Sequence, residues 1–181
     1  MIYQNDDYYI RPLEVEDVNS NYVEWLNDPK TNRYTSRGKW PMYPRMAVEI
    51  LKTLEGHGRA IVWAIFRKGI DGQEYHIGNI GLHDIDMINR SVEIAWLIGD
   101  QGYWGKGVAT LVGKWVLTHA FNKLNLHRVW CGCASNNKAM IRVAEKLGMK
   151  LIGATPEGLS IDSGWVNIMH FSLLRRNYDQ A

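Results

Sequence analysis

The sequence predicts a single domain of the α/β (α+β) class that covers residues 1–181, and three observations support this prediction. The chain is as long as one domain with a sizeable core. Short apolar segments linked by turns follow one another at 60–66, 75–82 and 92–98, which is typical of an antiparallel meander. Apolar residues recur at helical spacing on both sides of that meander. We therefore expect a mostly antiparallel sheet of about six to seven strands, with helices.

Composition and charge exclude several classes of partner. The formal net charge is only +2, and no basic stretch alternates with aromatic residues, so we expect no direct binding of nucleic acid. No apolar run reaches the roughly 20 residues that cross a bilayer. Residues 1–7 do not resemble a signal peptide. We therefore expect no membrane contact and a cytoplasmic location.

Cys131 and Cys133 are the only cysteines of the chain. They alternate on an expected strand, where side chains at i and i+2 share a face but diverge, so we expect no disulfide and a reduced protein. Their spacing does not suit a metal site, and we expect no metal.

The first part of the chain is expected to hold one strand and two helices. The strand lies at 8–11, and a helix follows at 14–26, where apolar residues recur at helical spacing and an Asn-Asp-Pro sequence ends the pattern. Residues 32–43 are irregular and rich in aromatic side chains. Pro44 suits the first turn of a second helix that runs to about residue 55.

Two further helices and three strands are expected after the meander. Apolar residues at i, i+3, i+4 and i+7 predict a helix from 108 to about 121. The same spacing predicts another helix that begins near Asn137 and has Gly148 at its C-terminal cap. The remaining strands are expected at 128–134, 150–154 and 165–173.

The stretch from Gly99 to Thr110 reads G-D-Q-G-Y-W-G-K-G-V-A-T and lies between an expected strand and an expected helix. The first N–H groups of a helix have no partner within it, and the helix dipole adds partial positive charge there. Glycines allow bare backbone to approach a bulky phosphate. The stretch therefore predicts an anion-binding turn.

Two common phosphate-binding patterns do not fit this turn. The P-loop requires Ser or Thr after Gly-Lys, whereas Gly105-Lys106 is followed by Gly107. The dinucleotide pattern G-x-G-x-x-G is present only with its two spacings reversed, and its strand would belong to a parallel sheet. A nucleotide-binding oxidoreductase is therefore a distant alternative.

The pattern G-x-G-x-A at Gly105, Gly107 and Ala109 resembles the phosphate-binding loop of the GCN5-related N-acetyltransferase (GNAT) family. A second segment, 137–149, resembles the family's Asn-initiated helix that ends in E-K-L-G and a large apolar residue. The two segments occur in the family's order, each after an expected strand.

The N-terminal part also resembles this family, so the likeness covers essentially the whole chain. Residues 10–13 read I-R-P-L and, with the stretch 22–27, are similar to the family's first strand and helix. The chain is most similar to the branch that contains ribosomal-protein alanine and serine N-acetyltransferases, spermidine acetyltransferase and nucleotide-amino-sugar acetyltransferases.

The resemblance implies a fold and a cofactor. It implies helices on both faces of the twisted sheet and two parallel strands, at 92–98 and 128–134, that splay apart to admit the pantetheine arm of acetyl-CoA. The loop would then hold the diphosphate. The residues that the resemblance places against acetyl-CoA are Leu97, Ile98, Gly102, Tyr103, Trp104, Gly105, Lys106, Gly107, Val108, Ala109, Asn137, Lys138 and Arg142.

The implied reaction is direct transfer of an acetyl group to a primary amine, with no covalent enzyme intermediate. Glu93 is the first candidate for the base, because a carboxylate in a central apolar strand is costly unless it is paired or functional. His83 is the reserve candidate, because imidazole titrates near neutral pH. Asp84 and Asp86 follow on the same strand end.

Two departures from the family pattern concern the leaving thiolate. Met140 stands where many members carry Ser, and Ala144 stands where others carry Tyr. Both usual proton donors are therefore missing, although a thiol with a pKa near 8.5 is a fair leaving group without help. A non-catalytic acyl-CoA-binding sensor is the alternative function.

The acceptor is expected to be an amino sugar, in particular a nucleotide-linked one, or a protein or peptide N-terminus. A polyamine would require a cluster of carboxylates that the segment covering the acceptor cleft does not offer. A homodimer is a candidate assembly. The residues that the resemblance assigns to the acceptor are Arg33, Tyr34, Trp40 and Asp84.

Overall fold

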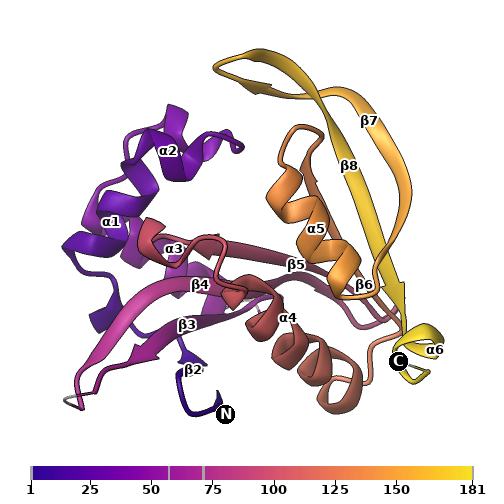
Figure 1. The fold of residues 1–181 in the computed structure, drawn as a ribbon, viewed down its shortest axis with the longest axis horizontal. Helices are drawn as coiled ribbons and strands as arrows, with labels where there is room; N and C mark the ends of the chain where they lie inside the picture. Colours follow the sequence, from indigo (N-terminus) through magenta and orange to yellow (C-terminus); the bar gives the residue numbers. More distant parts are fainter. Residues whose placement is uncertain (1, 57, 71, 181) are drawn as a thin grey trace.

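The computed structural model describes residues 2–56, 58–70 and 72–180 and contains an eight-stranded sheet (Figure 1). The strand order across the sheet is β1-β2-β3-β4-β5-β6-β8-β7. The strands are β1 (Tyr3–Gln4), β2 (Tyr8–Pro12), β3 (Ile61–Lys68), β4 (Glu74–Asp86), β5 (Ser91–Ile98), β6 (Arg128–Ala134), β7 (Lys150–Ile161) and β8 (Gly164–Leu174).

Six α-helices and four shorter helical turns complete the fold in the described residues. The helices are α1 (Ser20–Asn27), α2 (Pro29–Asn32), α3 (Pro44–Gly56), α4 (Val108–Thr118), α5 (Lys138–Lys146) and α6 (Arg175–Tyr178). The turns are η1 (Val15–Asp17), η2 (Arg37–Lys39), η3 (Gln101–Tyr103) and the π-helical η4 (His119–Lys123). The predicted α/β class and the antiparallel meander β3-β4-β5 are confirmed.

Three element boundaries differ from the sequence prediction. The eighth strand is the two-residue β1, which is too short for any periodic pattern. The helix expected from residue 14 begins only at Ser20, because Asn19 accepts the amide of Tyr22 as its N-cap. β7 continues to Ile161 instead of ending at 154, since β8 pairs with it along most of its length.

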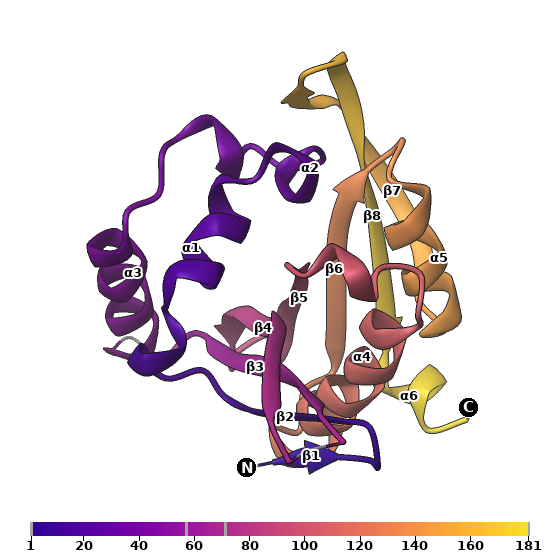
Figure 2. The ribbon, with the colours of Figure 1, turned by 60° about the vertical axis from the view of Figure 1, so that its left-hand side comes forward.

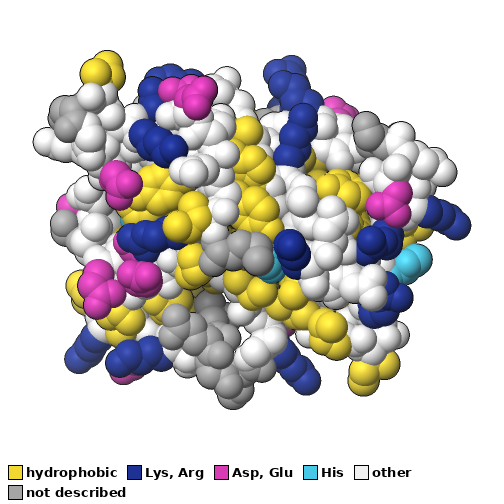
Figure 3. All heavy atoms as spheres, turned by 90° about the horizontal axis from the view of Figure 1, so that it is seen from below, with side chains coloured by type: hydrophobic (Ala, Val, Ile, Leu, Met, Phe, Trp, Pro, Cys, Tyr) yellow, Lys and Arg dark blue, Asp and Glu magenta, His cyan; other side chains and the backbone are white. Residues whose placement is uncertain are grey.

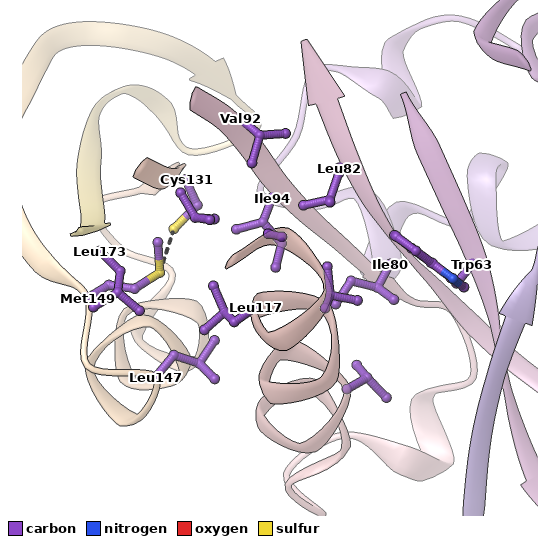
Figure 4. Close-up of a cluster of buried hydrophobic side chains, with 14 of the residues drawn as sticks. Trp63, Ile80, Leu82, Val92, Ile94, Leu117, Cys131, Leu147, Met149 and Leu173 are labelled. Atoms are coloured by element: carbon purple, nitrogen blue, oxygen red, sulfur yellow. Dashed lines mark hydrogen bonds between the residues drawn. The ribbon is translucent and has the colours of Figure 1, made fainter. Parts of the chain in front are cut away.

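Helices cover both faces of the sheet, as expected. On one face, α4 and α5 cover a core that includes Ile80, Ile94 and Leu147 (Figure 4). On the other face, α1 and α3 cover a smaller cluster that includes Leu51 and Phe66. Because alternate residues of a strand point to opposite faces, β2 and β3 contribute to both clusters.

β5 and β6 form the one parallel pair of the described sheet, and their pairing is short. The ladder joins Ser91 to Arg128 and ends at Glu93 opposite Trp130, although both strands continue further. Figure 2 shows the two strands with α1 and α2 on one side and α5 on the other. The expected splay of a parallel pair is therefore present.

The surface carries no concentration of one charge on the face shown in Figure 3, where basic side chains are dispersed among acidic and apolar ones. None of the helices in the described ranges has the length and hydropathy that a membrane crossing requires. Cys131 and Cys133 are both free thiols.

Candidate functional site

The glycine-rich loop presents unused backbone amides at the start of α4. Gly105 and Gly107 have φ of 74° and 83°, and a Cβ at either position would meet nothing within 4 Å. Gly107 is the N-cap of α4, so no side chain caps the helix. Within the described residues, no hydrogen bond uses the amides of Gly105, Gly107, Val108 or Ala109. These amides form a cradle for an anion.

The first part of the loop is held in place by local hydrogen bonds. The amide of Gly102 donates to Asp100 Oδ1 at 2.8 Å, so it is committed within the turn. Trp104 Nε1 donates to the carbonyl of Ile98 at 2.8 Å, and the Tyr103 ring packs against the core. The side chains of Tyr103, Trp104 and the buried Val108 therefore shape the loop, and only the backbone from Gly105 onward is open.

The gap between β5 and β6 adjoins this cradle. The Gly99 amide donates to the Ile77 carbonyl on β4, and backbone groups alternate along a strand. The amide of Leu97 therefore faces β4, whereas those of Trp96 and Ile98 face the gap beyond the last β5–β6 pair. Of Leu97 and Ile98, which the resemblance places against acetyl-CoA, only Ile98 directs its amide into the gap.

A cavity of about 350 Å³ lies on the α1/α3 face of the sheet and reaches the β5–β6 gap. Four predicted site residues line it, namely Tyr34, His83, Leu97 and Asn137. The other predicted residues lie outside its wall: Arg33, Trp40, Asp84, Glu93, Ile98, Lys106, Lys138, Arg142, and the loop residues from Gly102 to Ala109.

His83 and Glu93 are direct cross-strand partners on the cavity face of the sheet. The His83 imidazole lies over Gly81, where an added Cβ would come within 2.5 Å of Nε2. Both His83 and Glu93 have interaction partners in the structure. Of these two candidates, only the reserve candidate His83 lines the cavity.

Asn137 holds the start of α5 and retains a free donor toward the cavity. Its Oδ1 accepts the amide of Met140 at 3.2 Å, and its Nδ2 makes no hydrogen bond among the described residues. The side chains of Lys138 and Arg142 are exposed one turn apart on α5. The Lys106 ammonium lies 5.2 Å from the Tyr103 ring centre and is also exposed.

At two positions on α5, this chain lacks the side chains that usually donate a proton to the leaving thiolate in the family. Ala144 is 1% exposed within the main core and does not line the cavity. Met140 does line the cavity, but a thioether carries no proton to give. Cys133 lines the cavity as well, and burial raises the pKa of its thiol.

Contacts between the glycine-rich loop and the stretch 25–33, which contains the end of α1 and the whole of α2, were not predicted from the sequence. Gln101 Nε2 donates to Asp28 Oδ2 at 2.8 Å, and the Arg33 guanidinium lies 5.3 Å from the Trp104 ring centre. The Trp25 indole packs directly on Gly99, which leaves no space for a Cβ there. No periodicity marks such contacts, because they join residues about 70 positions apart.

Comparison with known proteins agrees with this geometry. A family model described as an acetyltransferase (GNAT) domain matches residues 8–150. YdaF of Bacillus subtilis, named provisionally as a ribosomal N-acetyltransferase, is 32% identical over 102 residues, which are 56% of this chain and 55% of that relative. The spermidine N(1)-acetyltransferase of Escherichia coli K12 is 28% identical over 93% of this chain and 87% of its own.

A solved structure shows the same fold over the whole domain. The spermidine N-acetyltransferase from Vibrio cholerae, in complex with CoA and spermine, superposes with a TM-score of 0.84 at 22% identity. The superposition covers 96% of this chain and 99% of the Vibrio chain.

Proposed function

The chain belongs to the GNAT acetyltransferase family, whose domain uses acetyl-CoA, and we propose that it acetylates the primary amine of a protein or peptide N-terminus or of an amino sugar. The observation that supports this most is the continuity of three features: the free amides of Gly105, Gly107, Val108 and Ala109, the β5–β6 gap and the cavity beside His83.

The residues present fit acetyl-CoA. The open space at Gly105 and Gly107 and the unused amides at the start of α4 suit a diphosphate, which the helix dipole also attracts. The backbone groups of Trp96 that face the gap suit the amides of an extended arm. Lys106, Lys138 and Arg142 are exposed cations for the outer phosphates. When bound, acetyl-CoA supplies a thioester carbon that an amine can attack.

The acceptor amine must lose a proton, because an alkylammonium has a pKa of about 10.4. We propose that the imidazole of His83, which lines the cavity, accepts this proton. The carboxylate of Glu93, on the neighbouring strand, would orient the imidazole. The backbone amide of Ile98 faces the place where the carbonyl oxygen becomes negative. The Asn137 Nδ2 group adds a second free donor.

The acceptor side favours an amine on a peptide N-terminus over a nucleotide-linked sugar. Phosphates would require cations, yet among the described lining residues there is no Lys or Arg. Arg33, one of the residues expected to bind the acceptor, lies over the rings of Tyr34 and Trp104. An amino sugar without phosphate remains compatible with the polar wall formed by Asn32, Thr35 and Asn79.

A thiol-release assay tests this function. The purified protein is incubated with acetyl-CoA and short peptides, free amino sugars or nucleotide-linked amino sugars, and free CoA is measured. We expect release with peptides above the background hydrolysis rate. The His83→Gln variant should lose about 10²-fold or more in kcat, as expected for a general base. The matched control His127→Gln, at an exposed histidine outside the cavity wall, should keep the wild-type rate. Binding of CoA without release for any acceptor would contradict the proposal and favour the sensor.

A further inference from the structure

The cavity contains an apolar compartment to one side of His83. It lies on the side of the sheet that α1 and α3 cover, between these two helices and β3. Leu13, Leu26, Ala47 and Leu51 are each 5% exposed, and Val62 faces them from β3. These side chains therefore form a buried apolar wall of the cavity.

Small residues keep the floor of this compartment deep. Val62 pairs with Gly81 on β4, and Gly81 pairs with Ala95 on β5, so a row of short side chains crosses three strands. The His83 imidazole lies over Gly81, in the middle of that row. A group attached next to an amine at His83 can therefore extend from the imidazole over Val62 toward α3.

The compartment offers nothing to pair with a charge. The lining includes no Asp, Glu, Lys or Arg among the described residues. The partly buried ion pair of Arg11 and Asp17 is not part of this lining, and its two members bond each other through two hydrogen bonds of 2.7 Å. An unpaired charge in such surroundings is strongly disfavoured, whereas an apolar side chain gains from its burial.

We propose that this compartment is a specificity subsite for an uncharged, apolar side chain adjacent to the acceptor amine. The inference deepens the proposed function and depends on it. It selects peptides whose first residue is apolar, and it disfavours peptides with a charged first residue as well as polyamines, which carry a second ammonium. The chain would thus differ in acceptor from the spermidine acetyltransferases to which it is similar.

Calorimetric titration of the CoA-saturated protein tests the subsite without requiring turnover. The probes are four hexapeptides that differ only in a first residue of Leu, Ala, Asp or Lys, together with spermidine. We expect the Leu peptide to bind about 10- to 100-fold more tightly than the Asp and Lys peptides and spermidine, in line with the discrimination that apolar pockets reach. Equal affinities, or tighter binding of a charged probe, would overturn the subsite.

Two variants on α3 connect the effect to the compartment. Ile50 lines the cavity and is 44% exposed, so Ile50→Glu should fold and should shift the Leu-to-Lys affinity ratio at least tenfold toward Lys. Met46 is a similarly exposed apolar residue of α3 that is not part of the wall, and Met46→Glu should leave the ratio unchanged. An identical response of both variants would contradict the proposal.

The thiol-release assay separates this inference from the proposed function. Release with all peptides at equal rates, together with equal affinities, would refute the subsite and leave the acetyltransferase intact. Absence of release with every amine would refute the function, while the calorimetric order would still decide the subsite.

Discussion

At the scale of single residues, a missing Cβ controls where the proposed base lies. Gly81 has no side chain, and the His83 imidazole occupies that space above β4. Gly81→Ala should therefore displace the ring while leaving its chemistry intact. We expect kcat to fall about 10-fold or more with a smaller change in CoA affinity, measured by steady-state kinetics and calorimetry. A Gly81→Ala enzyme with the wild-type kcat would contradict the role of His83.

His76 is a buried imidazole that the reaction does not use. Its Nε2–H donates to the Gly78 carbonyl at 3.0 Å, while Nδ1 is buried without a partner among the described residues. Burial lowers the pKa of His76 below its ordinary value of 6.5. The rings of Trp25 and Phe66 surround it, and Asp17 and Arg11 are the charged groups that act on it.

This environment predicts that acid destabilises the fold. The unfolded chain takes up a proton near pH 6.5, whereas the folded chain does so only at lower pH, so stability falls as the pH drops from 6.5 through the folded pKa. Urea unfolding at pH 7.5 and 5.5 measures this slope. His76→Gln should flatten the slope without abolishing it, because burial also lowers the pKa of His119. An unchanged slope would show that His76 is not responsible.

The two cysteines differ in access, and their labelling reports on the gap. Burial raises the pKa of Cys131 to about 12 and also raises that of Cys133, so both thiols should react slowly with alkylating reagents at pH 7.5 and faster as the pH rises. Cys133 lines the cavity with more exposure and should react first. Mass spectrometry should show that CoA slows this reaction. Faster labelling of Cys131 would contradict the burial argument.

At the scale of elements, the loop before α4 depends on glycine for both shape and access. Gly107→Ala should weaken CoA binding at least several-fold, because a methyl group would occupy the open cradle. It should also cost about 1–2 kcal/mol of stability for a left-handed alanine. Gly72→Ala is the matched control, with φ of 79° and equally open space in the turn between β3 and β4. Equal CoA affinity in both variants would contradict the cradle.

The glycine-rich loop is hydrogen-bonded to the start of α2, so we expect the binding of one substrate to change the affinity for the other. Asp28 caps α2 and accepts the Gln101 side chain, so ordering of the loop should also order α2. We expect CoA to raise the affinity for the acceptor peptide, and Gln101→Ala to reduce that gain several-fold. A double-mutant cycle with Asp28→Asn, measured by calorimetry, checks this. Additive effects of the two substitutions would show that the bond carries no coupling.

Sequence patterns predicted the elements that bury a periodic face. α4, α5 and the strands of the meander follow from apolar spacing, since each packs one face on a core. The irregular stretch before α3 was placed correctly, but its contacts were not, because aromatic content does not reveal direction. Trp40 is 77% exposed and lies outside the cavity, whereas Asn32 is buried and lines it. A polar side chain such as Asn32, which is buried because it makes hydrogen bonds, does not contribute to a periodic apolar pattern in the sequence.

At the scale of the whole molecule, the sheet places the proposed cofactor and acceptor sites at opposite ends of one gap. β5 and β6 part after Glu93, the cradle of α4 lies at one end, and the cavity under α1 and α3 opens at the other. The family likeness implied this arrangement from the sequence, and the splay is present. The sequence did not decide between His83 and Glu93 as the proposed base. That choice depends on the space above β4 that Gly81 leaves open because it has no side chain.

The central claim is that the open amides at the start of α4 and the β5–β6 gap hold acetyl-CoA. Amide chemical-shift mapping by NMR with the non-reacting product CoA tests it most directly. The largest shifts are predicted for the amides of Gly105, Gly107, Val108, Ala109 and Trp96. The amide of Gly72, which has the same backbone conformation in a distant turn, should not move. Unshifted resonances at 105–109, with saturable changes elsewhere, would contradict the account.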